Sequence, residues 1–461
     1  MQPSVPDARP TPNADRTGDF DWYVGIDGGG ATHQVCVLDA AGQRVAECAV
    51  AHSGAALTAF GAWLRELAGP SLARVAVGLE TPHGGPVALC LEAGAAVFAI
   101  NPKQLERFRE RLSAAGAKDD RRDAYVAASA LRTDRAVFHQ VRLDDARLVA
   151  VRELSRMGEE LREEATRLSN QLRAQLERYF PQVLTLVPAA DEPWVWGLLT
   201  EAPTPAAAAR LTEKRLTRLL REHRIRRVSG AEVRAALQGP ALPAVPGLVA
   251  AVSGHVTLLL PRLELVTRQS RRCAANLEAA LTALSALTAA DEAPQPDRGR
   301  DDAGAGAGTT PNAAGPGGPP PAAGPDLGTV VRVLRSLPGV GVGVAGVLLA
   351  EASAALLTAD YHALRTHSGT APVTKQSGKQ RLVVMRYACN HALRTALFHW
   401  ARVSIQHDTG ARQYYATLRG RGHSHARTLR SVSDRWLRIL TALLTTGTPY
   451  DPARFAAAAT P

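Results

Sequence analysis

Acidic residues follow two strand-like segments of the N-terminal part, and two more acids lie three apart further along. Asp27 closes one apolar run and Glu80 closes another. Asp120 and Asp123 open an Ala-rich segment, with the i, i+3 spacing that places two side chains on one helical face. Hard cations such as Mg²⁺ prefer carboxylate oxygens and leave their other positions to water and substrate phosphates. The pattern therefore predicts a metal site on an α/β scaffold, with a phosphodiester as substrate.

The N-terminal part alternates short apolar runs with helical patterns. Two strands around a glycine-rich turn, followed by a third strand, give the domain an antiparallel edge. The later strands are separated by helix-like segments, and Pro102 stands where a helix would begin. This order predicts a mixed α/β domain over residues 21–146, behind a disordered tail at 1–20. The predicted strands lie within 22–39, 43–50, 74–80 and 95–100, and the predicted helices include 55–67 and 118–131.

A heptad-like stripe of apolar side chains runs along residues 147–180, with Glu and Arg on the other faces. It predicts a long helix. A second helical region, about 248–287, would pair with it as an antiparallel coiled coil, and Pro261 should kink or interrupt that helix. Residues 147–289 are therefore predicted to form a helical coiled-coil region. An intramolecular bundle and self-association through these helices both remain open.

Residues 290–328 are dominated by Pro, Gly, Ala and Asp, and such a segment cannot bury enough apolar surface to fold. They predict a flexible linker, after which a mainly helical domain occupies residues 329–461. Its turn at 337–341 leads into the apolar helix 344–357 and resembles a helix-hairpin-helix turn, whose glycine amides can meet a DNA phosphate. A plain helical hairpin fits the same residues.

The chain carries a formal net charge of +11, and most of the excess lies from Thr329 onward. This is the footprint of a nucleic-acid surface, although solvated charge alone would give the same composition. The five cysteines are scattered, without a C-x-x-C pair for zinc or a disulfide framework, which predicts a reducing, cytoplasmic location. The sequence shows no export signal and no uninterrupted apolar run of membrane length, so no membrane association is expected.

The glycine-rich turn at 28–30, after Asp27, admits two functional interpretations. Such a turn can cradle ATP phosphates, as in sugar kinases of the actin and hexokinase type, which share an RNase H-like fold with polynucleotidyl transferases. A kinase should also have a second phosphate loop and an adenosine-binding Gly-Gly segment, and the sequence has neither in an appropriate place. A purely structural hairpin fits the turn as well.

Lys118 and Arg122 lie beside Asp120 and Asp123, and a run of this kind commonly forms a surface salt-bridge cluster. The conjunction of motifs favours a metal site instead. The strand that ends in Glu80 should lie beside the first strand, which brings the two strand-end carboxylates together.

Ser377 lies in a loop-like segment, 368–381, that contains glycines, a proline and interleaved cations. An unassisted hydroxyl is a weak nucleophile, so Ser377 would need a base or a metal, while nearby cations could hold the scissile phosphate. An ordinary phosphate-binding loop fits the composition equally. The cations predicted to contact nucleic-acid phosphates are Lys118, Arg122, Lys375, Lys379, Arg381, Arg386 and Arg394.

Motifs from both ends occur in a defined order around the helical region. The N-terminal motifs are Gly-Ile-Asp27 followed by His33, Gly-Leu-Glu80-Thr, and Lys118-x-Asp120-x-x-Asp123-Ala. The C-terminal motifs are Leu-Pro-Gly-Val-Gly at 337–341, Ser-Gly-Thr-Ala-Pro at 368–372, Gln-Ser-Gly-Lys at 376–379 and Asn-His-Ala-Leu-Arg at 390–394. Together they resemble the DEDD transposases of the insertion-sequence family IS110, relatives of the Piv pilin-gene invertase.

The resemblance implies an RNase H-like, RuvC-like N-terminal domain in which Asp27, Glu80, Asp120 and Asp123 bind Mg²⁺ or Mn²⁺. It implies that Ser377 is the nucleophile and forms a covalent phosphoserine link to a DNA strand. The active site would be composite, assembled between protomers of a dimer or tetramer. An element-encoded guide RNA would pair with donor and target DNA, and strand exchange would pass through a Holliday-junction-like intermediate.

The leading hypothesis is thus a metal-dependent, serine-using DNA transposase that acts on element ends and target DNA. A RuvC-like junction nuclease without a covalent step is the alternative enzyme. A noncatalytic nucleic-acid-binding protein is a third hypothesis, and a kinase would instead have to bind ATP.

Overall fold

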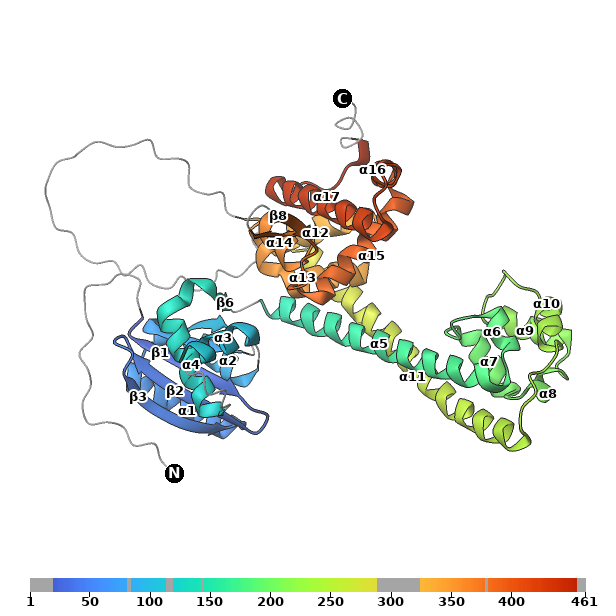
Figure 1. Ribbon diagram of the computed structural model, residues 1–461, viewed down its shortest axis with the longest axis horizontal. Helices are drawn as coiled ribbons and strands as arrows, with labels where there is room; N and C mark the ends of the chain where they lie inside the picture. Colours follow the sequence, from blue (N-terminus) through green and yellow to red (C-terminus); the bar gives the residue numbers. More distant parts are fainter. Residues whose placement is uncertain are drawn as a thin grey trace, which may run out of the picture. The chain divides into compact units, whose positions relative to one another are not determined.

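The structure is a computed structural model that describes residues 20–80, 84–112, 119–141, 145–287, 324–377 and 380–453. The chain divides into two compact units, with the boundary between Asp145 and Ala146 (Figure 1). Each unit buries apolar clusters of its own. The helical arm and the C-terminal helices, predicted as separate regions, belong to one unit.

A six-stranded sheet with the order β3-β2-β1-β4-β5-β6 forms the first unit. The first three strands make an antiparallel meander, β4 and β5 continue parallel to β1, and β6 closes the far edge antiparallel. The predicted antiparallel edge is therefore confirmed. The strands are β1 Trp22–Gly28, β2 Thr32–Asp39, β3 Arg44–Ala51, β4 Val75–Leu79, β5 Ala96–Ala99 and β6 His139–Val141.

Helices cover both faces of this sheet. On one face, α1 (Gly54–Ala68) and α2 (Gly85–Glu92) bury aromatic and aliphatic side chains against Val24 and Ile26 of β1. On the other face, α3 (Pro102–Leu112) and α4 (Asp120–Asp134) pack on the alternate residues of the same strands. Short 3₁₀ turns, Leu72–Arg74 and Arg135–Val137, precede β4 and β6. The predicted mixed α/β domain is confirmed, and its sheet is consistent with an RNase H-like fold.

Two long helices, α5 (Ala146–Tyr179) and α11 (Pro246–Ser285), lie side by side in the second unit. They are antiparallel, because Val151 near the start of α5 shares a core with Leu281 near the end of α11, whereas Leu176 shares one with Val256. The predicted antiparallel pairing is confirmed, while a supercoiled knobs-into-holes geometry and self-association stay predictions.

Pro261 does not interrupt α11, so a predicted interruption is wrong, while the alternative, a kink, stays a prediction. The ring is exposed on the outer face of the helix, and the neighbouring Leu259, Leu260 and Leu263 are buried in the core beneath it. A proline in a helix interior removes one hydrogen bond and costs about 3 kcal/mol. Burial of three leucines at about 1.5–3 kcal/mol each outweighs that cost.

A lobe of short helices connects the two long ones, and the expectation of a simple coiled-coil region missed it. Trp194 and Trp196 are buried at its centre. Its helix starts carry local signals, such as the capping box in which Ser229 Oγ accepts from the Glu232 amide while the Glu232 carboxylate accepts from the Ser229 amide. The helices are α6 Gln182–Leu186, α7 Pro193–Glu201, α8 Pro205–Ala208, α9 Glu213–Glu222 and α10 Gly230–Leu237.

One described helix segment, Gly247–Ser285, is long and apolar enough to cross a membrane by length and composition, which the sequence interpretation did not expect. Its apolar side chains include Val256, Leu259 and Leu263, which are buried in the lobe core. One side of this helix therefore packs in the core of the second unit.

The C-terminal part is helical apart from one β-hairpin. Its first helix starts at Leu327, where Asp326 accepts from the Thr329 amide. Most of the predicted linker, up to residue 323, lies outside the described residues. Residues 373–377 and 380–384 form two antiparallel strands, whereas the sequence predicted a loop over 368–381. The elements are α12 Leu327–Ser336, α13 Val342–Leu357, α14 Tyr361–His367, β7 Val373–Ser377, β8 Gln380–Val384, α15 His391–His407, α16 Thr409–Gly420 and α17 His425–Thr446.

Candidate active site

The strand-end carboxylates Asp27 and Glu80 lie at one edge of the sheet. β1 and β4 run parallel with Gly25 opposite Gly78, and the last pair in register is Ile26 with Leu79. Side chains alternate between the faces of a strand, so Asp27 shares the face of Gly25. Glu80, directly after β4, continues the face of Gly78. Both carboxylates are therefore placed on the face that α4 covers.

Close contact with the sheet fixes the position of α4. A Cβ added to Gly25 would lie 2.6 Å from the amide nitrogen of Ala128, so only glycine lets the helix approach this closely. Gly42, in the turn after β2, similarly abuts Arg132 near the C-terminal end of α4. That turn lies next to Trp22, at the N-terminal end of β1. The N-terminal end of α4 therefore points toward the C-terminal ends of β1 and β4, where Asp27 and Glu80 lie.

The two acids of α4 lie in different environments, although they share a helical face. Asp120 is exposed, whereas the Asp123 side chain is only 3% exposed. The guanidinium of Arg109, from α3, donates from Nε and Nη2 to the two carboxylate oxygens of Asp123 at 2.6 and 2.8 Å. Asp123 is thus a buried, bidentate ion-pair partner.

The described residues do not bring three or more acid, His or Cys side chains close enough to hold a metal ion. The four predicted ligands share one edge but are not gathered into a coordination shell. Their oxygen chemistry fits a hard divalent cation. Asp123 would be open to a cation only if Arg109 moved away. Of the flanking cations, Arg122 is half-buried and Lys118 lies outside the described residues.

Removing Arg109 should destabilise the first unit strongly. In Arg109→Ala the Asp123 carboxylate loses its partner while it stays buried, and such a loss costs about 3–5 kcal/mol. Arg111→Ala is the matched control, because its partner Asp134 is exposed at 3.5 Å and a surface pair contributes about 0–1 kcal/mol. Urea unfolding of the full chain measures both variants. Equal small shifts would show that the Arg109–Asp123 pair carries no such weight.

His33, part of the N-terminal motif, is a buried histidine opposite Gly28. Its Nε2 shares a hydrogen bond of 2.8 Å with Nδ1 of His52, and its Nδ1 has no partner among the residues that the structure describes. Burial and the neighbouring His52 ring lower the pKa of His33. The pair joins β2 to the segment after β3 beside the glycine-rich turn.

Ser377 is the last residue of β7 and is exposed. It lies opposite Gln380 in the hairpin, and within the described part of the chain no hydrogen bond holds its hydroxyl. The hairpin also exposes apolar side chains, with Leu382 60% and Val383 58% exposed. The candidate nucleophile is therefore accessible, and the described residues of its own unit supply no base that contacts it.

The cations predicted around Ser377 have different surroundings. Arg381 is exposed on β8, the side chain of Lys375 is not described, and Lys379 lies outside the described residues. Arg386 donates to the carbonyl of Ala371 at 3.4 Å. Arg394 in turn donates to the carbonyl of Arg386.

Two C-terminal motifs, one on each side of the hairpin in the sequence, make hydrogen bonds of their own. Ser368 is buried and shares a hydrogen bond of 3.1 Å with the hydroxyl of Thr370. Asn390 caps α15 by accepting from the Leu393 amide, and its side-chain amide donates to Glu351 at 2.8 Å. Both motifs therefore have structural roles, which their polar composition alone did not reveal.

The turn between α12 and α13 is held by α15. Gly339 has φ of 84°, and a Cβ there would lie 2.8 Å from the Ser404 amide nitrogen. The indole of Trp400 donates to the carbonyl of Pro338 at 3.0 Å. The two helices flanking the turn are present as predicted, while a contact between this turn and DNA phosphate stays a prediction.

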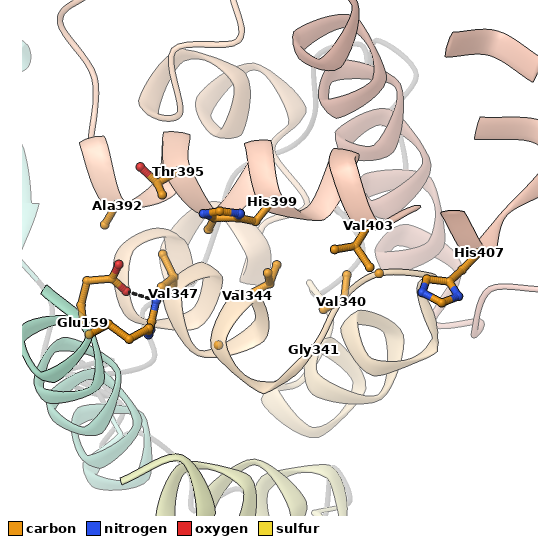
Figure 2. Close-up of a pocket in the computed structure, with 14 residues that line it drawn as sticks. Glu159, Val340, Gly341, Val344, Val347, Ala392, Thr395, His399, Val403 and His407 are labelled. Atoms are coloured by element: carbon orange, nitrogen blue, oxygen red, sulfur yellow. Dashed lines mark ion pairs between the residues drawn. The ribbon is translucent and has the colours of Figure 1, made fainter. Parts of the chain in front are cut away.

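A groove of about 490 Å³ opens beside this turn, and sequence reasoning did not find it. Figure 2 shows His399 and His407 on α15 across from Val340 and Val344. The ion pair of Glu159 with Arg162 closes one end at 2.7 Å. Its mostly apolar lining differs from the charged surroundings expected of a phosphate site.

Residues 24–181 match a family model described as a transposase, and this range contains all four candidate carboxylates. Residues 331–416 match the model of the transposase IS116/IS110/IS902 family, and this range contains Ser377. The two matches occur in the same order as the two sets of motifs.

Three relatives agree with these matches. A putative transposase, y4uE, of Sinorhizobium fredii is 43% identical over 206 residues, which are 44% of this chain and 57% of that protein. The mini-circle putative transposase for IS117 of Streptomyces coelicolor is 28% identical over 94% of this chain and 96% of its own length. An uncharacterized 43.6 kDa protein of insertion element IS110, from the same organism, is 27% identical with the same coverage. With both models matched in order, the chain belongs to the IS110 family of transposases.

Proposed function

We propose that the chain is an insertion-sequence transposase that cuts and rejoins DNA with Ser377 as the nucleophile. The observation that carries the proposal is the exposed hydroxyl of Ser377 on a short hairpin whose base is surrounded by arginines. Family membership supports the activity on insertion-sequence DNA. The edge of the first unit that carries Asp27, Glu80, Asp120 and Asp123, here called the carboxylate edge, supports use of a divalent cation, Mg²⁺ or Mn²⁺.

The proposed chemistry is a transesterification at a DNA phosphate. Ser377 Oγ attacks phosphorus, and the new Oγ–P bond forms as the bond from phosphorus to one bridging nucleoside oxygen breaks. The hydroxyl proton of the serine ends on the departing oxygen, which becomes the free hydroxyl of one strand end. In the second step a hydroxyl of another strand attacks the phosphoserine and releases Ser377. No net hydrolysis occurs.

Activation of Ser377 has to come from outside its own hairpin, because no described side chain there contacts its hydroxyl. Asp27, Glu80 and Asp120 would hold a divalent cation, and Asp123 would join them once Arg109 is displaced. When bound, that cation would stabilise the negative charge that develops on the phosphate oxygens. Arg381 and Arg386 would orient the same phosphate from the side of the serine.

The proposal includes two partners besides DNA. An element-encoded guide RNA would select donor and target sequences by base pairing, so the protein would contact backbone more than base edges. The acids and the serine lie in different units, which is compatible with a composite site shared between protomers of a dimer or tetramer. The family resemblance supports both points.

A denaturing gel tests the proposal. Full-length protein is incubated with Mg²⁺, end-labelled duplex carrying the ends of its own element, and RNA transcribed from the flanking sequence. We expect a labelled, protease-sensitive band at the size of a protein–DNA adduct, which disappears when EDTA replaces Mg²⁺. Cut DNA without that band would support a junction nuclease instead. Binding without cutting would support a noncatalytic nucleic-acid-binding protein.

A further inference from the structure

Helices α15 and α17 pack against each other in the C-terminal domain (Figure 1). The indole rings of Trp400 and Trp436 stack with centroids 5.7 Å apart. Ser433 donates to the carbonyl of Leu397 at 3.0 Å. The residues one turn earlier on each helix lie beside this contact.

The residues one turn earlier are Arg394 on α15 and Arg430 on α17. Both reach the segment that directly follows β8: Arg394 donates to the carbonyl of Arg386, and Nη2 of Arg430 lies 3.0 Å from Sδ of Met385. Arg427 lies one further turn back on the same face of α17. Three guanidinium groups thus gather at the base of the hairpin that carries Ser377.

This arginine cluster, Arg394, Arg427 and Arg430, has no carboxylate partner among the described residues. A thioether is a weak acceptor, so Met385 leaves most donors of the half-buried Arg430 unused. Burial, followed by the charges of Arg394 and Arg427, lowers the pKa of Arg430.

Arg365, elsewhere in the same domain, is neutralised by a carboxylate. One turn beyond Arg430 on α17, Asp434 accepts from Arg365 at 2.9 Å. Helix α17 therefore supplies a carboxylate to Arg365, but its described residues supply none to the three guanidinium groups of the arginine cluster. Like charges held together in a partly buried place cost stability, and such sites are commonly functional.

We propose that the arginine cluster binds one backbone phosphate of the DNA strand that Ser377 attacks. This inference rests on the proposed function. A guanidinium matches phosphate with paired N–H donors, and a bound phosphate would relieve the mutual repulsion of the cluster. Arg427 and Arg430 also lie beyond the C-terminal family match, which ends at residue 416.

The hairpin sets the spacing between the two phosphates. Ser377 pairs with Gln380 at one end, and Val373 pairs with Val384 at the other, next to the cluster. Four strand residues span about 13 Å. One DNA strand advances about 3.4 Å per nucleotide along the duplex axis. The cluster would therefore hold a phosphate about four nucleotides from the one that Ser377 attacks.

Arg430→Gln in the full-length chain tests the site by fluorescence anisotropy with a labelled element-end duplex at several salt concentrations. We expect DNA affinity to fall about tenfold and the salt slope to fall by about 1, at every sequence tested. Arg173→Gln is the matched control, because Arg173 is an exposed arginine already paired with Glu177 at 2.9 Å, and it should leave both quantities unchanged. Thermal unfolding of each variant checks that the fold is intact.

A phosphate scan then locates the contact. Duplexes with one neutral methylphosphonate each are compared on wild type and Arg430→Gln. We expect one position, about four nucleotides from the serine-linked phosphate, to weaken wild type and leave the variant unaffected. The inference would be overturned if every methylphosphonate weakened DNA binding by wild type and by Arg430→Gln to the same extent. It would also be overturned if Arg430→Gln weakened binding of RNA but not of DNA. Formation of the protein–DNA adduct by wild type is measured separately on the denaturing gel. If wild type forms no adduct but Arg430→Gln still weakens DNA binding at the expected position, only the proposed chemistry is refuted.

Discussion

Ser377→Ala should abolish the protein–DNA adduct completely while DNA binding is retained. Alanine lacks the oxygen that forms the bond to phosphorus, so no residual covalent product is expected. The side chain is exposed and makes no hydrogen bond within the described residues, so its loss should change the free energy of unfolding by less than about 0.5 kcal/mol. The denaturing gel measures the adduct, and anisotropy measures DNA binding.

Thr374→Ala is the matched control for this variant. Thr374 is another exposed hydroxyl residue on β7, opposite Val383, and its loss should leave the adduct unchanged. Ser377→Cys adds a positive arm, because a thiolate is also a nucleophile and could be trapped on DNA. An adduct that persists in Ser377→Ala would show that another residue attacks the phosphate, and the serine mechanism would have to be abandoned.

The sheet and the long helices were predictable because their patterns are local. Alternating and continuous apolar runs around Asp27 and before Glu80 mark strands, and the stripe along α5 marks a helix that needs burial on one side. The lobe of short helices was missed although Ser229 with Glu232 forms a readable capping box. Helices of four to ten residues carry too few turns to show a period.

The candidate site was predictable in its residues but not in its arrangement. Spacing alone could not show that Arg109, fourteen positions before Asp123, takes both of its carboxylate oxygens. Nor could it show that the packing of α15 against α17 brings Arg394 and Arg430 together. Contacts between elements distant in sequence depend on how helices pack, and a single sequence does not encode that packing in any local pattern.

Asp27→Asn should reduce strand cleavage by about 100-fold or more while the first unit stays folded. The amide keeps the shape of the carboxylate but removes the charge that would hold a divalent cation, and loss of several kcal/mol of charge stabilisation corresponds to such a factor. Asp39→Asn is the matched control, because Asp39 ends the neighbouring strand at the opposite edge of the sheet and caps the Gln43 amide at 2.8 Å. It should leave the cleavage rate unchanged.

The effect of Asp27→Asn on cation binding can also be measured without activity, through the melting temperature. If the carboxylate edge binds Mg²⁺ or Mn²⁺, titration with Mn²⁺ should raise the melting temperature of wild type and of Asp39→Asn, but raise that of Asp27→Asn much less. Arg109 competes for Asp123, so Arg109→Ala should gain more stability from the ion than wild type does. If the ion shifts all four proteins equally, the edge is no metal site, and the strand-end acids would belong to the structural framework of the sheet. The activation of Ser377 would then have to come from a group outside the four carboxylates.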